Sequence, residues 1–588
     1  MLQSSPSASG LSIPLIEGSL TLIAVAVSFA WPKLGSGWFA SIERLFGKLA
    51  RRRVLSVIFV GLSALLLRMA FLPLFPIPLP FIPDDFSFLL AADTFAHGRL
   101  TNPTPAMWVH FESLQIDMKP TYTSMYFPGP GLVLAAGKVL LGHPWFGLLI
   151  ANALMCAAIC WMLQAWLPAG WALLGGILAV LRISLFSYWI NTYTGGGAVS
   201  ALGGALVLGA LPRFMRHARF RHAMLLAIGI VLLAYTRPYE GMLLCLPVAA
   251  ALGHWLIKEK NRPSALVLLK RAAVPLALLI AAAAWLGYYN YRAFGSPLTL
   301  PYTINRDTYA ATPYYIWQSL RPEPVYRHIE MRNFYDRHEL ALYHEAHSLY
   351  RFVPFSITKA IAVVCFFAGF ALLIPILMLR RTLLDHRVRF LVLCLLLLAA
   401  GMSIEIFLLA HYTAPFTVAF YAVGLQAMRH LRVWAPEGRA VGKGLVRMSI
   451  AICVIMAALR GFGQFLPFPS DRSQGARGFW WYGPDHAGVE RAKTEQKLEM
   501  LPGNKLLLVR YSPTHDGIDE WVYNAADIDH SKVIWAHAMS PTSDQELVNH
   551  YQDRHVWLVE PDAQPVRVTP YPSAAQLTMA SQQSLAAK

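Results

Sequence analysis

Residues 81–130 read FIPDDFSFLLAADTFAHGRLTNPTPAMWVHFESLQIDMKPTYTSMYFPGP, a polar segment punctuated by prolines between long apolar stretches. The segment carries five acidic residues against two basic ones, and Asp84 and Asp85 directly follow an apolar run that ends at Pro83. Adjacent carboxylates repel each other, which can raise the pKa of one of them into the range useful for proton transfer. We therefore interpret the pair as a candidate general base. The alternative is that Asp84 caps a helix that starts at Phe86.

The composition of the chain is that of a polytopic membrane protein. Of its 588 residues, 56% are hydrophobic and only 14% are charged, and apolar stretches long enough to cross a bilayer recur along it. The formal net charge of +17 would suggest nucleic-acid binding in a soluble protein. Here the Lys and Arg residues cluster in short turns between apolar stretches, which indicates membrane topology and no nucleic-acid partner. All six cysteines lie in apolar stretches, so no disulfide framework is expected.

The alternation of apolar stretches and basic turns predicts about twelve transmembrane helices with both termini outside. The basic segment 33–53 is expected on the cytoplasmic side, so the span 54–75 delivers Asp84 and Asp85 to the opposite side. The short apolar segment 131–141 is expected to be an interfacial or re-entrant helix. The other expected spans are 11–32, 145–166, 169–188, 196–212, the hairpin 222–257, 272–291, 354–379, 390–410, 411–428 and 447–465.

The chain is expected to have three parts. Residues 1–53 form a first span and a basic cytoplasmic loop, and residues 54–465 form a transmembrane domain with external loops at 76–128 and 292–353. Residues 466–588 have the composition of a small soluble α/β domain outside the membrane, introduced by a linker with Trp480, Trp481 and Tyr482 at the interface. In it we expect a helix at 486–501, strands at 505–511, 532–537 and 555–560, a helix at 542–552 and a disordered tail.

Ionisable residues inside the predicted spans gather toward their outward ends. Such residues are energetically unfavourable in a membrane and mark functional sites by default. Their gathering suits a cavity that is open to the outside and binds an anionic group at the membrane surface, such as a lipid phosphate. The alternative for each is that the side chain snorkels to the headgroups. The residues are Arg68, Arg182, Arg237, Glu240, Arg292, Glu405 and His411.

No metal site is predicted from a ligand motif. The HEAH run at His344 to His347 is one residue short of the spacing that places two histidines on one helical face. These two, with His328 and His338, are interpreted as surface or packing residues. A divalent cation held by Asp84 or Asp85 stays open as a cofactor. The glycines 195–197 lack a phosphate-loop context, so a soluble nucleotide donor is not expected.

The segment that begins at Pro83-Asp84-Asp85 resembles the first external loop of the GT-C superfamily of integral-membrane glycosyltransferases. It is most similar to the protein O-mannosyltransferase, aminoarabinose-transferase and lipopolysaccharide-core (Rgt-like) branch, which has a small-residue helix, here FSFLLAADTFAHGRL, and a later Pro-Gly step, here YFPGPGLVLAAGKVLLG. The resemblance covers roughly residues 54–465. It implies a GT-C-like helical fold, a polyprenyl-phosphate sugar donor and inversion of configuration. The family's catalytic aspartate falls on Asp84, with Asp85 at the second acidic position.

The sequence departs from this family at one position. Family members often have a basic residue before the proline of the later step, whereas Phe127 precedes Pro128 here. The donor phosphate, whose negative charge builds as it leaves, must therefore find its cation elsewhere. The candidates for this role are Lys119, Arg237, Arg292 and His411. Candidates for binding the sugars are Trp108, Tyr126, Tyr193, Tyr239 and Glu240, although aromatic residues at this depth also form interfacial belts.

The sequence therefore favours an inverting glycosyltransferase that acts outside the cytoplasm, in a bacterial inner membrane, on a lipid, polysaccharide or protein acceptor. The first alternative is a transporter or flippase of lipid-linked saccharides, which is expected to show two related halves with interrupted helices. No such repeat is visible in the sequence. The second alternative is a non-catalytic scaffold that presents the C-terminal domain to a partner in the cell envelope.

Overall fold

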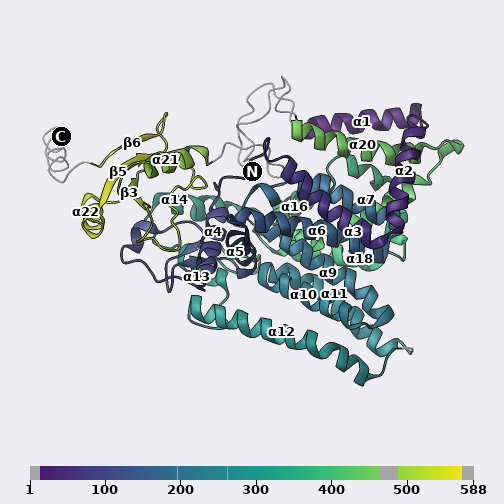
Figure 1. Cartoon of the computed structure of the whole chain (residues 1–588), viewed down its shortest axis with the longest axis horizontal. Helices are drawn as coiled ribbons and strands as arrows, with labels where there is room; N and C mark the ends of the chain where they lie inside the picture. Colours follow the sequence, from purple (N-terminus) through teal and green to yellow (C-terminus); the bar gives the residue numbers. More distant parts are fainter. Residues whose placement is uncertain (1–12, 195, 261, 463–487, 572–588) are drawn as a thin grey trace. The chain divides into compact units, whose positions relative to one another are not determined.

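The computed structural model describes residues 13–194, 196–260, 262–462 and 488–571 (Figure 1). The chain forms two compact units. The first, here called the helical unit, comprises Met1–Pro78, Trp145–Ala284 and Ser348–His486. The second, the loop unit, comprises Leu79–Pro144, Trp285–His347 and Ala487–Lys588. The loop unit thus combines most of the two predicted external loops with the C-terminal region.

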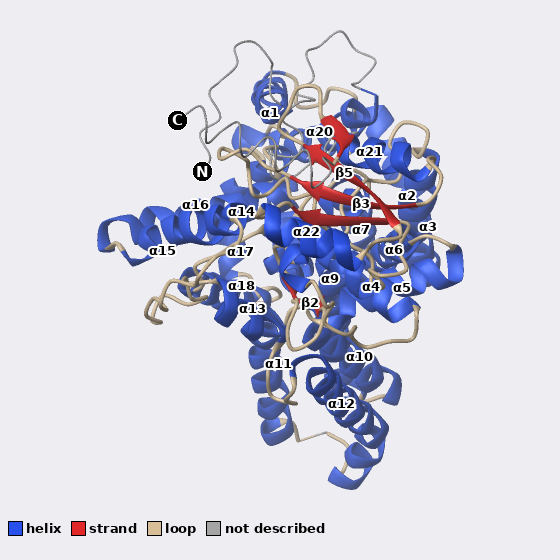
Figure 2. Ribbon diagram, turned by 90° about the vertical axis from the view of Figure 1, so that its left-hand side faces the viewer, coloured by secondary structure: helices blue, strands red, loops and turns tan. Residues whose placement is uncertain are grey.

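The helical unit consists of helices joined by short turns (Figure 2). Its α-helices are α1 (Ile13–Ala30), α2 (Ser36–Arg51), α3 (Arg53–Ala70), α6 (Pro144–Trp166), α7 (Ala169–Ala179), α8 (Tyr188–Asn191), α9 (Gly196–His217), α10 (Phe220–Thr236), α11 (Pro238–Lys258), the first part of α12 (Ala265–Phe294), α16 (Leu349–Ala368), α17 (Leu379–Leu384), α18 (Arg389–Ile404), α19 (Thr417–Arg432) and α20 (Val441–Phe462). Tighter or wider helical turns are η2 (Val180–Ser184), η4 (Ala371–Met378), η5 (Ala410–Phe416) and η6 (Pro436–Gly438).

The long apolar helices make the chain a multi-pass membrane protein. Among the described residues, eight helices are long and apolar enough to cross a membrane, or nine if the bent pair Ile374–Leu384 and Arg389–Ile404 forms one span. Three further apolar helices are shorter, at Pro128–Leu141, Ala169–Ser184 and Phe220–Thr236. The total of about twelve spans stays a prediction, because it requires Ala169–Ser184, Phe220–Thr236 and α19 to cross as well.

The predicted spans 354–379 and 411–428 are not the continuous helices expected from the sequence. The span 354–379 is interrupted because α16 ends at Gly369, which adopts a left-handed φ of 57°. The span 411–428 begins as the 3-10 turn η5, which contains Pro415, and becomes α-helical only at α19. A proline cannot donate the backbone hydrogen bond that a continuing helix needs. The basic segment 33–53, expected to be a loop, contains the helix α2.

The loop unit mixes short helices and strands. Its elements are α4 (Pro83–Ala96), η1 (Trp108–Phe111), β1 (Ile116–Asp117), β2 (Thr123–Ser124), α5 (Pro128–Leu141), the end of α12, α13 (Pro301–Tyr309), α14 (Ile329–Arg332), η3 (Asn333–Glu339), α15 (Leu340–His347), α21 (Val489–Glu499), β3 (Asn504–Val509), β4 (Val533–His537), α22 (Pro541–His550), β5 (Arg554–Glu560) and β6 (Arg567–Pro570). The short helix expected near 131–141 is confirmed as α5, and the expected C-terminal strands and helices are confirmed as β3, β4, β5, α21 and α22.

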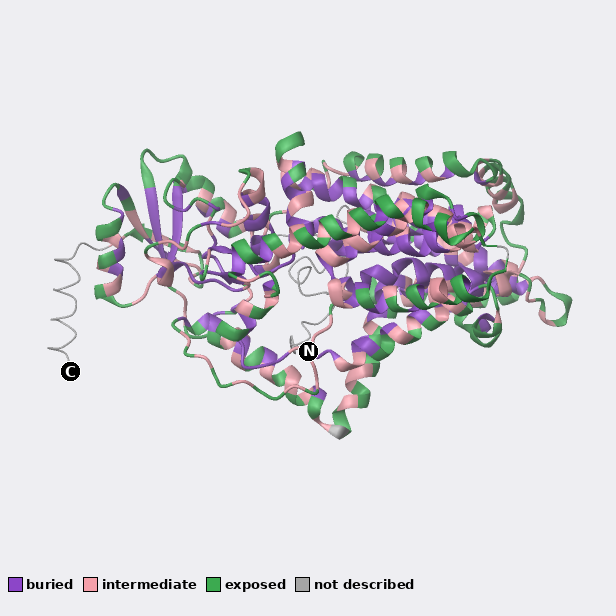
Figure 3. Ribbon diagram, turned by 90° about the horizontal axis from the view of Figure 1, so that it is seen from below, coloured by how far each residue is buried: buried purple, intermediate pink, exposed green. Residues whose placement is uncertain are grey.

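The C-terminal sheet has the strand order β4-β3-β5-β6. Strand β3 runs parallel to β4 and β5, and β6, which was not predicted, is antiparallel to β5. Both faces of the central strands are buried, as is usual for parallel strands (Figure 3). One face, with Leu506, packs in the same cluster as Phe86 of α4 and Phe111 of the first loop. The opposite face, with Leu507, packs with Leu498 of α21.

Two expectations fall on residues that the structure does not describe. The aromatic linker with Trp480, Trp481 and Tyr482 lies outside the described residues, and so does the whole of the predicted disordered tail, 573–588. Gly195, the first residue of the glycine triplet, is also outside them.

Candidate functional site

The acidic pair lies in the first turn of α4. The helix begins at Pro83, whose fixed φ suits the first helical position. The positive end of the helix dipole favours the negative charges of Asp84 and Asp85 in this turn. The side chain of Asp85 is fully buried, and its Oδ2 accepts a hydrogen bond from the backbone N–H of Phe81 at 3.4 Å. The alternative in which Asp84 caps a helix starting at Phe86 is therefore wrong, because the helix already includes both acids.

Asp84 differs from its neighbour in being half-buried. Its Oδ1 accepts a hydrogen bond from the hydroxyl of Tyr126 at 2.7 Å. Tyr126 is itself held in place, because its ring stacks on Phe88 with 4.3 Å between centroids and meets Tyr302 edge-on at 5.8 Å. Tyr126 was predicted to bind substrate, and in the structure its hydroxyl contacts the Asp84 carboxylate. The Asp84 carboxylate is positioned by one hydroxyl and is still partly accessible.

The C-terminal region supports α4 immediately after the acidic pair. The ring of Phe86 stacks on Tyr523 with 4.1 Å between centroids and an interplanar angle of 5°. The Arg491 guanidinium lies 4.8 Å from the centroid of the same Phe86 ring. Further along α4, Asp93 accepts a hydrogen bond from the backbone N–H of Ala526 at 2.9 Å. The orientation of α4 therefore depends on the C-terminal region of the same unit.

Lys119 and Trp108, both predicted site residues, meet in the first loop. The Lys119 ammonium lies 4.1 Å from the centroid of the Trp108 ring, and the Arg327 guanidinium lies 4.9 Å from it. Arg327 also pairs with Glu112 at 3.1 Å. Arg292 is exposed at the end of α12, where its Nη1 donates to the hydroxyl of Tyr288 at 3.1 Å.

A second group of buried charges in the loop unit was not predicted. His537, the last residue of β4, places Nδ1 2.7 Å from Oε1 of Glu330 and donates from Nε2 to the backbone oxygen of Glu112 at 2.9 Å. The ring of His328 stacks on His537 with 4.2 Å between centroids. Burial alone lowers the pKa of His537, but the carboxylates of Glu520 and Glu330 raise it to about 9. A buried imidazolium thus links the segments around Glu112 and Glu330 to the carboxyl end of the sheet.

This histidine group includes donors suited to a divalent metal. His328, Glu330 and His537 each have one ligand atom within 4.8 Å of the other two, and histidine and glutamate are usual zinc ligands. In the structure both ring nitrogens of His537 already make the hydrogen bonds just described. The remaining histidines of the second loop, His338, His344 and His347, are exposed, as expected for surface residues.

Charged residues also gather in the helical unit, where α10 and α11 lie side by side (Figure 1). Arg237 joins these two helices and places Nη1 3.8 Å from Oε1 of Glu240. Its guanidinium lies 4.0 Å from the centroid of the Tyr412 ring. Glu405 interacts electrostatically with both Glu240 and Arg237, and the Lys359 ammonium donates to its backbone oxygen. We call Arg237, Glu240, Lys359, Glu405 and Tyr412 the Arg237 group.

Other predicted site residues of the helical unit have structural partners. His411 precedes Tyr412, and its Nδ1 lies 2.9 Å from the hydroxyl of Tyr188. Tyr239 precedes Glu240 and donates to the backbone oxygen of Gly401 at 2.9 Å. Tyr193 donates to the backbone oxygen of Pro78 at 2.9 Å. Lys359 was not predicted as a site residue. It could have been, because a single lysine inside the predicted span 354–379 is the kind of residue that marks a functional site in a membrane protein.

Arg68 and Arg182 make their hydrogen bonds and ion pair with residues outside the Arg237 group. Arg68 donates to the backbone oxygen of Phe75 at 2.8 Å and to Oδ1 of Asn191 at 3.1 Å. Arg182 pairs with Glu17 of α1 at 2.9 Å, and both side chains are buried. These two arginines stabilise the packing of the helices, so the expected gathering of ionisable residues is partial.

No family model and no curated protein matches the chain. Among solved structures, ArnT from Cupriavidus metallidurans in the apo state matches with 13% identity and a TM-score of 0.48, covering 86% of this chain and 92% of ArnT. ArnT bound to undecaprenyl phosphate matches with 14% identity and the same TM-score and coverage. The Archaeoglobus fulgidus oligosaccharyltransferase in complex with Zn and sulfate matches with 12% identity and a TM-score of 0.45, covering 86% of this chain and 67% of its own.

Proposed function

We propose that the chain is an inverting glycosyltransferase of the GT-C type with Asp84 as its general base. It would move a sugar from a polyprenyl-phosphate donor to a lipid, polysaccharide or protein acceptor on the extracytoplasmic face of a bacterial inner membrane. The observation that carries this proposal is the contrast within the acidic pair. Asp85 is buried and hydrogen-bonded to the backbone, whereas Asp84 is half-buried and held by the Tyr126 hydroxyl. Proton abstraction from an acceptor hydroxyl needs a carboxylate that is both positioned and reachable.

The reaction sets two demands on the chain. The acceptor oxygen attacks the anomeric carbon and loses its proton to Asp84, while the bond from that carbon to the phosphate oxygen breaks and the lipid phosphate leaves. A cation must stabilise the charge that develops on this phosphate. We assign this role first to Arg237, because a buried guanidinium acts in a low dielectric. Lys119 and Arg292 are exposed alternatives in the loop unit, and His411 stands beside Tyr412.

Glu240 limits how Arg237 can serve this phosphate. The ion-pair distance of 3.8 Å between the two side chains is longer than that of a tight Arg–carboxylate pair. An incoming phosphate would compete with Glu240 for the same guanidinium. The sugar-binding roles of Trp108, Tyr126, Tyr193, Tyr239 and Glu240 stay predictions within this proposal, as does a divalent cation at Asp84.

The test measures the polyprenyl phosphate that the donor releases, so the identity of the acceptor need not be known. The purified chain in nanodiscs is given polyprenyl-phosphate hexose or pentose together with a membrane extract, and release of polyprenyl phosphate is measured by mass spectrometry. Asp84→Asn should lower turnover by about 10²- to 10⁴-fold, the usual range for a general base. The matched control is Asp307→Asn, which removes an exposed acid of the loop unit that pairs with Arg321 at 3.0 Å. Undiminished turnover in a well-folded Asp84→Asn protein would reject the base assignment.

A transporter of lipid-linked saccharides is the second candidate, because several helices are interrupted. Helix α16 ends at Gly369, and the helices Ile374–Leu384 and Arg389–Ile404 meet at an angle of 110°. The segment η5 is a 3-10 turn in place of an α-helix. Discontinuous helices with charged residues at their ends are typical of transporters. Proteoliposomes with a labelled lipid-linked saccharide distinguish the two functions. Transbilayer movement that Asp84→Asn does not affect, without sugar transfer, would favour the transporter.

A further inference from the structure

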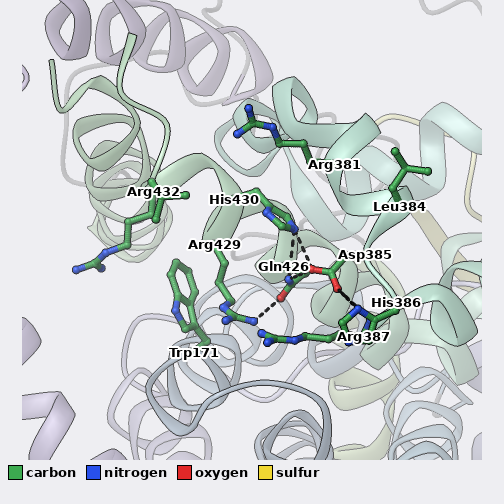
Figure 4. Close-up of a pocket in the computed structure, with 11 residues that line it drawn as sticks. Trp171, Arg381, Leu384, Asp385, His386, Arg387, Gln426, Arg429, His430 and Arg432 are labelled. Carbon is green, nitrogen blue, oxygen red and sulfur yellow. Dashed lines mark hydrogen bonds and ion pairs between the residues drawn. The ribbon is translucent and has the colours of Figure 1, made fainter. Parts of the chain in front are cut away.

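A basic cavity opens among turns of the helical unit that the proposed transferase reaction does not use. It has a volume of about 760 Å³, within the usual range of ligand pockets. Its walls come from α17, the turn before α18, the last turn of α19 and the start of α7. Four arginines line it, Arg381, Arg387, Arg429 and Arg432 (Figure 4).

The charges in this cavity are unbalanced. Asp385 is the one carboxylate among its lining residues, and it is already engaged by Gln426, by His430 at 3.0 Å and by the backbone N–H of Arg387 at 3.0 Å. Arg432 pairs with Glu43, outside the lining, at 2.9 Å. Within the described part of the chain, the other three arginines have no carboxylate within ion-pair distance. Because Arg387 and Arg429 repel each other electrostatically, the cavity would be stabilised by a bound anion.

A partly buried hydrogen-bond network orients the donors of this cavity. Gln426 is buried, donates to Asp385 and accepts from Nη1 of Arg429 at 2.6 Å. Figure 4 shows Gln426, Asp385 and His430 joined to one another, with Arg429 and Arg387 beside them. An arginine held in this way loses less side-chain entropy on binding a ligand, and its planar fork suits phosphate oxygens.

The rim of the cavity adds apolar side chains to these cations. Leu384 is 63% exposed and Val433 is 74% exposed, and Trp171 stands at the start of α7. Exposed apolar residues and tryptophan beside arginines are typical of the headgroup region of a bilayer. Basic pockets between transmembrane helices bind the phosphates of anionic lipids.

We propose that this cavity is a phosphate-binding site, filled by the headgroup of an anionic phospholipid or by a free phosphate compound. Arg381, Arg387 and Arg429, the last held in place by the buried Gln426, recognise the phosphate oxygens, and the apolar rim receives the first acyl carbons when the source is a lipid. The inference does not depend on the proposed transferase activity, because it uses none of the residues assigned to that reaction.

The experiment uses the full chain purified in a neutral detergent. Native mass spectrometry counts bound cardiolipin, phosphatidylglycerol and phosphatidylcholine, and a thermal-shift series tests inorganic pyrophosphate. The test variant is Arg381→Gln with Arg387→Gln, both exposed in the structure. The control is Arg216→Gln with Arg221→Gln, which removes the same charge from two exposed arginines at the turn between α9 and α10. The test variant should bind the anionic ligand at least about tenfold more weakly, and the control should match the wild type.

The outcomes separate the two sources and can overturn the site. Retention of cardiolipin or phosphatidylglycerol in the presence of millimolar pyrophosphate assigns the site to a lipid headgroup. A pyrophosphate-induced thermal shift that disappears in the test variant, without lipid selectivity, assigns it to a free phosphate compound. Equal losses in the test and control variants, or no difference between anionic and zwitterionic ligands in the wild type, overturn the proposal. If the test variant fails to fold, Arg429→Lys keeps the charge but removes the fork, and it should weaken binding several-fold.

Discussion

Two helices, one in each unit, begin with the same local pattern and reach different outcomes. Helix α4 starts Pro83-Asp84-Asp85 and helix α11 starts Pro238-Tyr239-Glu240, so both have proline at the first helical position and an acid in the first turn. Both follow the same rules for a helix N-terminus. In α4, Asp84 stays half-buried and accepts from one hydroxyl. In α11, Glu240 is 3% exposed and lies beside a guanidinium.

The difference shows which level of structure makes a carboxylate available for chemistry. The local pattern sets where each helix begins and favours an acid there. The surroundings then decide whether that acid meets solvent, as Asp84 does, or a buried cation, as Glu240 does. The four predictions below test this distinction, beginning with the largest expected effect.

The largest effect is expected from breaking the buried pair of α11. Arg237→Gln or Glu240→Gln should each lower the free energy of unfolding by about 3–5 kcal/mol, because each removes one member of a buried ion pair. The double variant should be more stable than the sum of the single losses predicts. Thermal unfolding in detergent measures all three, with the exposed Arg216→Gln as control. Losses that simply add would show that the two side chains are not coupled.

Asp117 sharpens the comparison, because it is a buried carboxyl that forms no ion pair with any of the described residues. It is 1% exposed, and its Oδ1 accepts from Nδ2 of Asn305 at 3.0 Å. Burial raises its pKa to about 8, although the Asn305 hydrogen bond lowers it. The unfolded chain releases this proton near pH 3.9. The contribution of Asp117 to stability is therefore complete below about pH 4 and is lost as the pH rises toward 8, by up to about 1.4 kcal/mol per pH unit.

Asp117→Asn should remove this pH dependence, because the amide resembles the protonated acid and does not titrate. Thermal unfolding of the wild type and the variant between pH 4.5 and 8.5 measures the effect. The variant should be the more stable protein at pH 8, and the two curves should approach each other toward pH 4.5. Parallel curves would mean that Asp117 does not hold its proton in the folded protein.

Asp85→Asn tests the other member of the acidic pair. The change weakens the bond to the Phe81 N–H and the interaction with the helix dipole, so we expect a loss of about 1–2 kcal/mol in unfolding free energy. Turnover should fall far less than in Asp84→Asn. Release of polyprenyl phosphate measured side by side decides between them. Equal loss of turnover in two stable proteins would give Asp85 a direct part in the reaction.

Tyr126→Phe should have the smallest effect. The ring keeps its stacking on Phe88, and only the hydroxyl that holds Asp84 is lost, which is worth about 1 kcal/mol. Turnover should fall several-fold with little change in thermal stability. Tyr326→Phe, which removes a hydroxyl that donates to the backbone oxygen of Tyr309, is the matched control. A turnover equal to that of the control would show that the hydroxyl does not position the base.

The breaks in the membrane helices could not be predicted from composition. Averaged hydrophobicity shows that residues 354–379 are apolar, but it carries no information on backbone dihedral angles. It therefore could not predict the positive φ of Gly369 at which α16 ends. The C-terminal strands were predictable, because short runs rich in Val, Leu and aromatic residues alternate with helical ones. Their parallel order was not, because strand pairing depends on contacts between segments that are distant in the chain.

The charged groups were predictable in part. Ionisable residues in apolar spans pointed to Arg237, Glu240, Glu405 and His411, which the helical unit brings together through α11, α18 and η5. The histidine group of the loop unit was hidden, because His328 and His537 are distant in the sequence and no spacing connects them. For the same reason the stacking of Tyr523 on Phe86 could not be foreseen.

By itself, the sequence determined that this is a multi-pass membrane protein with a C-terminal region of strands and helices, and that two acids follow Pro83 at a helix start. Those features depend on hydrophobicity and on local backbone preferences, which neighbouring residues set. The tertiary structure alone decided that Asp85 is buried, that Asp84 stays reachable beside Tyr126 and that Arg237 lies against Glu240 and Tyr412. Burial and charge pairing arise from residues far apart in the chain, and these determine what an ionisable side chain can do.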